Sequence, residues 1–355
     1  MGQTNCSLCS CDNKENELHL ELTEADSLKA STRGLKSAGL LSSQARLNFL
    51  SPQSKRKQDL FKRCTQHLTQ VVKIQAVWRG YQDRKLCQHL CKMQRESGRY
   101  FTQAERLESG NVSFALNERE VRPAYTFQNG AVYVGEWRGS ARDGHGEQTW
   151  PDDAKYVGEW RENKAQGQGV FYHADGDVYE GMWSNDKANG YGVYTHSNGS
   201  QYKGDWKEDL QHGYGAETWP DGNRYEGYYV QGKKHGFGSY FWGDGAKYVG
   251  QWLDNKISGK GCYTWPDGRK YEGDWENNMM SGRGEYTWTD GRRYRGKYED
   301  DKKHGEGTYT WTDGRKYEGQ WRLGQQHGPG VYTYPDGTSR RGVWENGKRV
   351  RWTDE

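Results

Sequence analysis

Three closely spaced cysteines near the N-terminus carry the most reactive side chains of this sequence. Cys6, Cys9 and Cys11 form a Cys-x-x-Cys-x-Cys pattern. Three thiolates could bind zinc, but a structural zinc site needs four ligands, and the fourth would have to be His19 or come from elsewhere in the chain. We therefore predict no metal site here. Two other roles for these thiols stay open, fatty acylation and plain free thiols.

Gly2 favours acylation of the same segment. A glycine exposed by removal of Met1 is the acceptor in N-myristoylation, although the usual Ser or Thr at position 6 is Cys6 here. One myristoyl chain gives only marginal membrane binding, on the order of 10⁴ M⁻¹, so stable anchoring needs a second signal such as palmitate on nearby cysteines. We predict lipidation at Gly2, Cys6, Cys9 and Cys11. A flexible, Ser-rich tether is expected to follow, up to residue 50.

Four histidines recur at multiples of 23 residues and could be taken for metal ligands. They are His212, His235, His304 and His327, each ten residues after a tyrosine of the repeat described below. Other repeats carry Asp143, Gln166, Asn189, Ser258 or Ser281 at this position. Polar side chains of these types can hydrogen-bond to the backbone of a turn. We therefore expect polar turn contacts, and neither a metal site nor a cofactor.

Residues 51–108 predict a basic amphipathic helix. They hold 13 Lys and Arg against 5 Asp and Glu, a net charge of +8, whereas residues 133–355 hold 31 against 35, a net charge of −4. Apolar side chains three or four residues apart would form one stripe along this helix. The stripe consists of Phe61, Cys64, Leu68, Val71, Ile74, Trp78 and Tyr81. A basic amphipathic helix suits an acidic binding groove or an anionic membrane surface.

Part of this helix fits a known sequence pattern: residues 74–84, IQAVWRGYQDR, match IQxxxRGxxxR at every defined position. The segment therefore resembles an IQ motif, to which calmodulin and related light chains bind. The resemblance assigns calmodulin binding to Ile74, Gln75, Trp78, Arg79, Gly80 and Arg84. Gly80 would cost about 1 kcal/mol inside a helix, which favours close approach by a partner. The alternative is that the helix packs on the repeats that follow, and the two uses could alternate as a switch.

A 23-residue repeat occupies most of the remaining chain. Its first residue is Tyr, at positions 133, 156, 179, 202, 225, 248, 271, 294 and 317. Gly follows two residues later, and Trp or Tyr two residues after that Gly. Two more glycines lie eleven and thirteen residues after the Tyr, and most units end near Asp-Gly. Such a unit cannot bury its own apolar face, so the repeats must stack on one another.

The repeat predicts two short strands per unit. Alternation places Tyr, Gly and the second aromatic residue on one face of the first strand, and the Gly leaves room for a neighbouring ring or backbone. Asp-Gly favours a tight hairpin turn between units, and Gly-x-Gly is expected to begin the second strand after a polar loop. The predicted core comprises Tyr133, Trp137, Tyr156, Trp160, Tyr179, Trp183, Tyr202, Trp206, Tyr225, Tyr248, Trp252, Tyr271, Trp275, Tyr294, Tyr317 and Trp321.

The pattern YxGxWxxxxxHGxG…DG resembles the MORN repeat (membrane occupation and recognition nexus), over residues 133–350 as nine full repeats and a partial tenth. The resemblance implies a mainly β fold, an elongated single-layer antiparallel β meander, preceded by the α-helical IQ segment and the flexible N-terminus. It implies scaffolds at membranes, cytoskeletal junctions and cilia, with a groove that binds a partner peptide or helix in several cases. Residues 109–132 are then a connector with a half repeat.

Composition argues against several other classes of protein. Of 355 residues, 32% are hydrophobic, yet 16 are Trp, 25 are Tyr and 48 are Gly, which suits a thin aromatic sheet. No apolar run approaches the roughly 20 residues of a membrane span. The net charge of −4 over residues 133–355 disfavours nucleic-acid phosphates. Seven cysteines at irregular spacings do not suggest a disulfide framework, so we expect a cytoplasmic protein.

The resulting hypothesis is a non-catalytic scaffold or adaptor, with no enzymatic activity. It would be lipid-anchored at the inner face of the plasma membrane or at a ciliary or cortical membrane. Calmodulin or a related light chain would bind the IQ motif, and a cytoskeletal or signalling protein the MORN groove. The alternatives are a ciliary or flagellar structural protein of the radial-spoke type and a non-catalytic regulator of a phosphoinositide kinase. Exposed terminal strand edges would also allow a homodimer.

Overall fold

The computed structural model describes residues 98–109 and 118–354 of the chain. All of these belong to one compact unit, Val77–Glu355. The predicted lipidation site, the tether and the IQ motif lie outside the described residues, so the structure does not test them.

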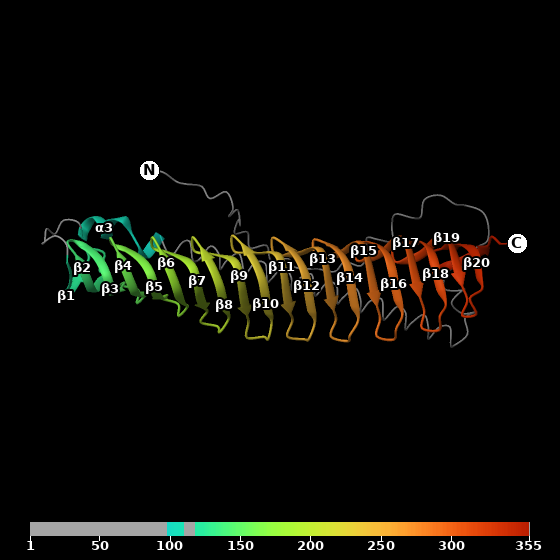
Figure 1. The fold of residues 1–355 in the computed structure, drawn as a ribbon, viewed down its shortest axis with the longest axis horizontal. Helices are drawn as coiled ribbons and strands as arrows, with labels where there is room; N and C mark the ends of the chain where they lie inside the picture. The colour runs from blue at the N-terminus through green and yellow to red at the C-terminus, as the bar shows by residue number, and fades with distance from the viewer. Residues whose placement is uncertain (1–97, 110–117, 355) are drawn as a thin grey trace, which may run out of the picture. The chain divides into compact units, whose positions relative to one another are not determined.

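The described residues form a helical segment at residues 98–100, one short helix and a single antiparallel sheet of 21 strands (Figure 1). The helix is α3 (Gln103–Ser109). The strands are β1 (Arg119–Thr126), β2 (Val132–Arg138), β3 (Ala141–Thr149), β4 (Lys155–Arg161), β5 (Lys164–Tyr172), β6 (Val178–Ser184), β7 (Lys187–Thr195), β8 (Gln201–Lys207), β9 (Leu210–Thr218), β10 (Arg224–Val230), β11 (Lys233–Phe241), β12 (Lys247–Leu253), β13 (Lys256–Thr264), β14 (Lys270–Glu276), β15 (Met279–Thr287), β16 (Arg293–Glu299), β17 (Lys302–Thr310), β18 (Lys316–Arg322), β19 (Gln325–Thr333), β20 (Ser339–Glu345) and β21 (Lys348–Trp352).

Consecutive strands pair throughout the sheet, so the chain meanders, and Figure 1 shows the strands side by side in chain order. The predicted mainly β, single-sheet antiparallel meander over the repeats is therefore confirmed. The helix that the sequence predicts up to residue 108 is interrupted at Phe101 and Thr102. Thr102 Oγ1 accepts a hydrogen bond from the Glu105 N–H (3.4 Å) and so caps the start of α3.

Each repeat buries a tyrosine over a pair of glycines. In β10, Tyr225 is fully buried, and Gly227 pairs with Gly238 of β11. A Cβ atom on Gly227 would lie 2.5 Å from the Gly238 Cα and 2.5 Å from the Tyr225 hydroxyl. The Tyr225 hydroxyl donates to the Tyr228 carbonyl (3.1 Å). Gly227 and Gly238 are therefore both required to be glycine, because the Tyr225 side chain occupies the space that their Cβ atoms would need.

Aromatic side chains join each repeat to the next. The ring of Tyr156 lies 5.1 Å from Trp160 of its own repeat and 5.1 Å from Trp183 of the following one, both edge to face. The Trp183 Nε1–H donates to the carbonyl of Gly169 (3.1 Å). Contacts of this kind recur along the sheet, so the core is a continuous row of rings in which each repeat depends on its neighbours.

The tight two-residue turn lies within a repeat, which the sequence analysis did not predict. Glu208 and Asp209 connect β8 to β9, with φ angles of 51° and 65°. Positive φ at both positions is the geometry of a type I′ hairpin turn. The second strand, β9, begins at Leu210, three residues before Gly213. The prediction of a polar loop ending at Gly-x-Gly was therefore wrong.

Asp-Gly does join one repeat to the next, in a slightly longer loop. Between β9 and β10, the Gly222 N–H donates to the Trp219 carbonyl (3.0 Å), and the Trp219 N–H donates to the Asn223 carbonyl (3.0 Å). Only the glycine of the pair has a positive φ, of 82°. Asp221 instead accepts a hydrogen bond from the Asn223 N–H through Oδ1 (3.1 Å). This geometry is a type I turn followed by a left-handed glycine.

The second residue of the two-residue turn fastens its repeat to the previous one. The Asp209 N–H donates to the Ala188 carbonyl (3.1 Å), and Asp209 Oδ1 accepts from the Ala188 N–H (2.8 Å). The same two bonds join Asn278 to Ile257. An Asn or Asp side chain suits both tasks, because it tolerates positive φ and supplies an acceptor.

Candidate binding face of the repeat array

The sheet face onto which the repeat Tyr and Trp side chains point is called the aromatic face below. Residues 98–109 pack on its N-terminal part, as Figure 1 shows for α3. Phe101 is 7% exposed, and its ring lies 5.4–6.0 Å from five aromatic rings. These rings belong to Trp150, Tyr156, Trp160, Phe171 and Trp183. The segment therefore inserts an aromatic anchor into the row of rings.

Glu105 of α3 is a buried charged anchor beside Phe101. Its side chain is 1% exposed. The carboxylate accepts hydrogen bonds from Gln148 Nε2 (3.0 Å), Trp150 Nε1 (3.2 Å) and Asn129 Nδ2 (2.5 Å). It also lies 3.7 Å from Nη1 of Arg142. A buried carboxylate with three donors and a cation is fully satisfied, so α3 is held in one position.

Arg142 forms the sheet's side of this contact. It is 1% exposed, and its guanidinium lies 4.3 Å from the ring centroid of Trp160. Burial lowers the pKa of Arg142 to about 10, and the Glu105 carboxylate opposes that shift. The guanidinium is therefore charged at neutral pH. Arg106 of α3 adds a second ion pair, with Asp186.

The aromatic face is less buried towards its C-terminal end. Trp150 and Phe171, which contact Phe101, are only 4% and 3% exposed. From β9 onward most side chains at the equivalent repeat positions are partly exposed, whereas Glu217, Tyr286 and Tyr309 stay buried. The partly exposed rings include Trp219, Tyr240, Trp242, Tyr263, Trp265, Trp288, Trp311 and Tyr332. Partly exposed rings in a continuous row offer apolar area with polar edges, which is typical of a protein-binding surface.

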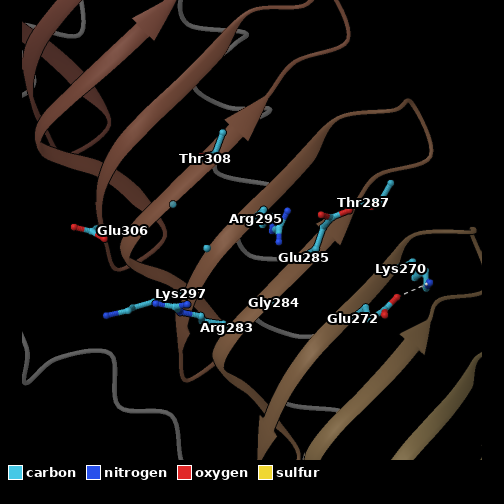
Figure 2. A pocket seen from close by; sticks show the side chains of 12 residues that line it. Lys270, Glu272, Arg283, Gly284, Glu285, Thr287, Arg295, Lys297, Glu306 and Thr308 are labelled. Atoms are coloured by element: carbon cyan, nitrogen blue, oxygen red, sulfur yellow. Dashed lines mark hydrogen bonds and ion pairs between the residues drawn. The ribbon is translucent and has the colours of Figure 1, made fainter.

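The opposite face of the sheet carries a charged pocket over β14–β17. Figure 2 shows the side chains that line this pocket. The volume of the pocket is about 660 Å³. Its charged lining consists of Lys270, Arg283, Arg295, Lys297, Glu272, Glu285 and Glu306. Lys270 pairs with Glu272 (2.9 Å). Four cations against three carboxylates leave little net charge, so this pocket lacks the concentrated positive charge that a phosphate site uses.

The repeat histidines lie beside turns. His304 Nδ1 is 3.0 Å from a Glu299 carboxylate oxygen. At the same repeat position, Asp143 accepts from the Glu162 N–H (3.3 Å) and Gln166 from the Asn185 N–H (3.1 Å). The last two are the polar turn contacts that the sequence predicts, made to the two-residue turn of the following repeat. Over residues 98–109 and 118–354, no three His, Cys, Asp or Glu side chains gather as metal ligands would.

Two repeats carry Tyr in place of the second Trp, and the structure predicts opposite effects of restoring Trp. The buried Tyr298 hydroxyl has no hydrogen-bond partner among the described residues. In Tyr298→Trp, the indole N–H would reach the Gly284 carbonyl, as the Trp321 N–H reaches that of Gly307 (3.0 Å). We expect Tyr298→Trp to raise the free energy of unfolding by about 1 kcal/mol.

Tyr229→Trp is the matched control. The Tyr229 hydroxyl donates to Glu217 (3.0 Å), which also pairs with Lys234. Removing a partner from this buried network should lower the free energy of unfolding by about 1–3 kcal/mol. Urea unfolding of both variants measures the two effects. A shift of both variants in the same direction would contradict the role given to these hydroxyls.

The remaining predicted site residues lie outside the described residues and stay predictions. They are Gly2, Cys6, Cys9, Cys11, Ile74, Gln75, Trp78, Arg79, Gly80 and Arg84. Phe101, Glu105 and Arg142 were not among the site residues predicted from the sequence. No helix in the described part of the chain has the length and apolar character needed to cross a membrane.

Comparison with known proteins identifies the repeat and the motif. The family model of the MORN repeat matches nine segments, at residues 133–155, 156–178, 179–201, 202–224, 225–247, 248–268, 271–292, 294–314 and 317–339. The model of the IQ calmodulin-binding motif matches residues 70–88. No curated protein matches the chain.

Solved structures give only weak similarities. The wild-type TCP10 domain of Danio rerio CPAP, in complex with a peptide of Danio rerio STIL, is 13% identical. That match covers 67% of this chain and 100% of that chain, with a TM-score of 0.27. The SAS-4 TCP domain of Drosophila melanogaster, in complex with a proline-rich motif of Ana2, is 11% identical over 51% of this chain and 86% of that chain, with a TM-score of 0.26. TM-scores this low do not indicate a shared fold.

The nine MORN matches together cover more than half of the chain and coincide with the strands β2–β19. The spacing of Tyr, Gly and the second aromatic residue in each match is the spacing that builds the aromatic face. The chain belongs to the MORN-repeat family and carries an IQ calmodulin-binding motif ahead of its repeats.

Proposed function

We propose that this protein is a non-catalytic scaffold held at the cytoplasmic face of a membrane. Calmodulin or a related light chain binds its IQ motif, and the aromatic face of the repeat array binds a cytoskeletal or signalling protein. The observation that carries the proposal is the order of the modules: the IQ motif at residues 70–88 precedes nine MORN repeats in one chain. Both families typically consist of scaffold or binding proteins.

The aromatic face supports the partner-binding part of the proposal. Residues 98–109 of the chain itself pack there, with Phe101 and Glu105 buried. The face therefore accepts a peptide segment that offers an aromatic ring and a carboxylate. From Trp219 onward the face also includes partly exposed rings, such as Trp242 and Trp311, so further surface of the same kind is open to a second protein.

Calmodulin binding is assigned to Ile74, Gln75, Trp78, Arg79, Gly80 and Arg84. These residues lie inside the matched IQ segment. Apolar side chains there would enter the groove of calmodulin, and the basic side chains would face its acidic rim. Because residues 98–109 begin only ten residues after the matched segment, a light chain on the motif would lie close in sequence to a segment docked on the array.

Membrane attachment is assigned to acyl groups on Gly2, Cys6, Cys9 and Cys11. Basic residues at 54–63 add attraction to anionic lipid, at about 1 kcal/mol per Lys or Arg close to the surface. Two kinds of signal together give stable anchoring where one acyl chain does not.

Cell fractionation tests the proposed function. We expect the wild-type protein to sediment with membranes and to bring calmodulin with it. Gly2→Ala should move most of the protein to the soluble fraction. Without a myristoyl chain on Gly2, the nearby cysteines would not be held at the membrane for palmitoylation. Ile74→Ala with Gln75→Ala should leave the protein on membranes but remove the calmodulin. If the Gly2→Ala protein sediments as fully as wild type, the acyl anchor is wrong.

A further inference from the structure

One position of the repeat carries a cation in only three units. It lies nine residues after the first Tyr and points onto the aromatic face, where it pairs with the second aromatic residue of its unit. The three pairs are Arg142 with Trp137, Lys234 with Tyr229 and Lys303 with Tyr298. Other units carry Ala165, Ala188, Gln211, Ile257, Met280 or Gln326 there. A cation on a buried aromatic face is costly unless it has a partner of opposite charge.

Two of these cations have such a partner. Arg142 lies 3.7 Å from Glu105, which α3 brings to the face. Lys234 pairs with Glu217 of the sheet itself, at 2.8 Å. Glu217 has no counterpart in the other two units, since Tyr125 and Tyr286 occupy its repeat position. A carboxylate for these units must therefore come from another part of the chain or from another molecule.

Lys303 has no ion pair within residues 98–109 and 118–354. Its Nζ lies 4.6–5.1 Å from the ring centroids of Trp288, Tyr294, Tyr309 and Trp321. Four rings offer cation–π attraction but no charge. Burial, helped by the nearby Arg292, lowers the pKa of Lys303 to about 8. The charge of Lys303 is thus incompletely compensated, whereas the preceding repeat has the neutral Met280 at the same position. A buried charge that lacks a compensating partner typically marks a functional position.

The surroundings of Lys303 repeat the docking site of α3. The five rings that contact Phe101 have aromatic equivalents seven repeats later in every case. The equivalents are Trp311, Tyr317, Trp321, Tyr332 and Trp344. Trp311 and Tyr332 are partly exposed, whereas their counterparts Trp150 and Phe171 are 4% and 3% exposed. The site near Arg142 is filled by Phe101 and Glu105, and its copy near Lys303 is more open.

The two sites also differ in their polar side chains. Asp290 replaces Asn129, but the Asp290 carboxylate is engaged with Arg292 at 2.6 Å. Arg292 stands where the first unit has Ala131, and its charge is balanced by Asp290, so Lys303 remains the cation of this site without a carboxylate partner among the described residues. Tyr309 replaces Gln148 and has a hydroxyl where Gln148 has an amide.

We infer that the aromatic face around Lys303, over β15–β20, binds an acidic segment of a partner protein. The segment places a Glu or Asp carboxylate on Lys303 and an aromatic side chain among Trp311, Tyr317 and Tyr332. An aromatic residue four positions before the acid, as in Phe101 and Glu105, fits this spacing. The inference rests on the proposed partner-binding role of the aromatic face and gives the chemistry of the partner.

A peptide with the sequence of residues 98–109, GRYFTQAERLES, is the probe. It is labelled with a dye and titrated with the full-length chain, and fluorescence anisotropy gives its dissociation constant. We expect Lys303→Met to weaken binding about 10-fold or more, the loss of a charge-assisted hydrogen bond. Met280 occupies the same position in the preceding repeat, so the fold should tolerate the change. Lys302→Met is the control, because it removes an equal charge from an exposed neighbouring position.

Changing the peptide tests the same contact without altering the protein. A peptide with Gln at the position of Glu105 should bind the wild-type chain about as weakly as the original peptide binds Lys303→Met. Combining the two changes should weaken binding little further. No binding to wild type, or equal binding to Lys303→Met, would overturn the inference. Self-association of the full chain that Lys303→Met abolishes would also overturn it, because the occupant would then be a second copy. None of these outcomes depends on calmodulin or acylation, so they are separable from a failure of the proposed function.

Discussion

Replacing Gly227 with Ala is expected to cost about 3 kcal/mol or more of the free energy of unfolding, at the upper end of overpacking effects. The added Cβ would lie 2.5 Å from the backbone of Gly238 and 2.5 Å from the Tyr225 hydroxyl. Neither can move far, because Gly238 is held in the ladder of β10 and β11 and the Tyr225 hydroxyl donates to the Tyr228 carbonyl. A single methyl group should therefore separate the two strands locally.

Hydrogen exchange measured by mass spectrometry locates this effect. Contacts in a repeat array are mostly between neighbours, so exchange should rise in β8–β13 and stay near wild type in β2–β5 and β17–β20. Gly314→Ala is the control for backbone strain alone. Gly314 has a φ of 88° but no atom within 4 Å of its Cβ position, so about 1 kcal/mol is expected there. Loosening spread evenly over all repeats in Gly227→Ala would contradict a nearest-neighbour core.

The alternation of Tyr, Gly and Trp was enough to predict the single antiparallel sheet and its buried face. The alternation is sufficient because it sets which side chains share a face within one repeat, and every repeat has the same alternation. Turn geometry was harder to predict. Asp-Gly looked like the tightest turn, but the two-residue turns lie at pairs such as Glu208–Asp209. The periodic Asn or Asp at their second position was a usable signal, because such a residue both accepts positive φ and bonds to the previous repeat.

The packing of residues 98–109 could not be predicted from periodicity, because this segment occurs once. Its short helix is held by tertiary contacts of Phe101, Glu105 and Arg106 with the repeats, among them the bond from Arg106 to Asp186, 80 residues away in sequence. The role of Arg142 could not be predicted from the repeat pattern either, since most repeats carry a neutral side chain at its position. A cation at a buried repeat position is in retrospect the signal that a carboxylate must approach that unit.

The second large effect is expected at the IQ motif. Ile74→Ala with Gln75→Ala should weaken calmodulin binding by about 100-fold, since an apolar anchor and a polar contact are both lost at the centre of the interface. Thr65→Ala with Gln66→Ala is the control, because both residues precede the matched segment and lie off the apolar stripe. This control should bind as wild type does.

Isothermal titration of the full-length chain with calmodulin is the most direct test of the scaffold account. A scaffold that binds calmodulin through its IQ motif should show saturable binding of one calmodulin per chain, retained by the Thr65 and Gln66 variant and lost in the Ile74 and Gln75 variant. If the wild-type chain shows no binding of calmodulin, the scaffold proposal is contradicted, and a helix that packs only on the repeat array is favoured. Equal binding by the Ile74 and Gln75 variant would contradict it as well, because calmodulin would then bind elsewhere on the chain.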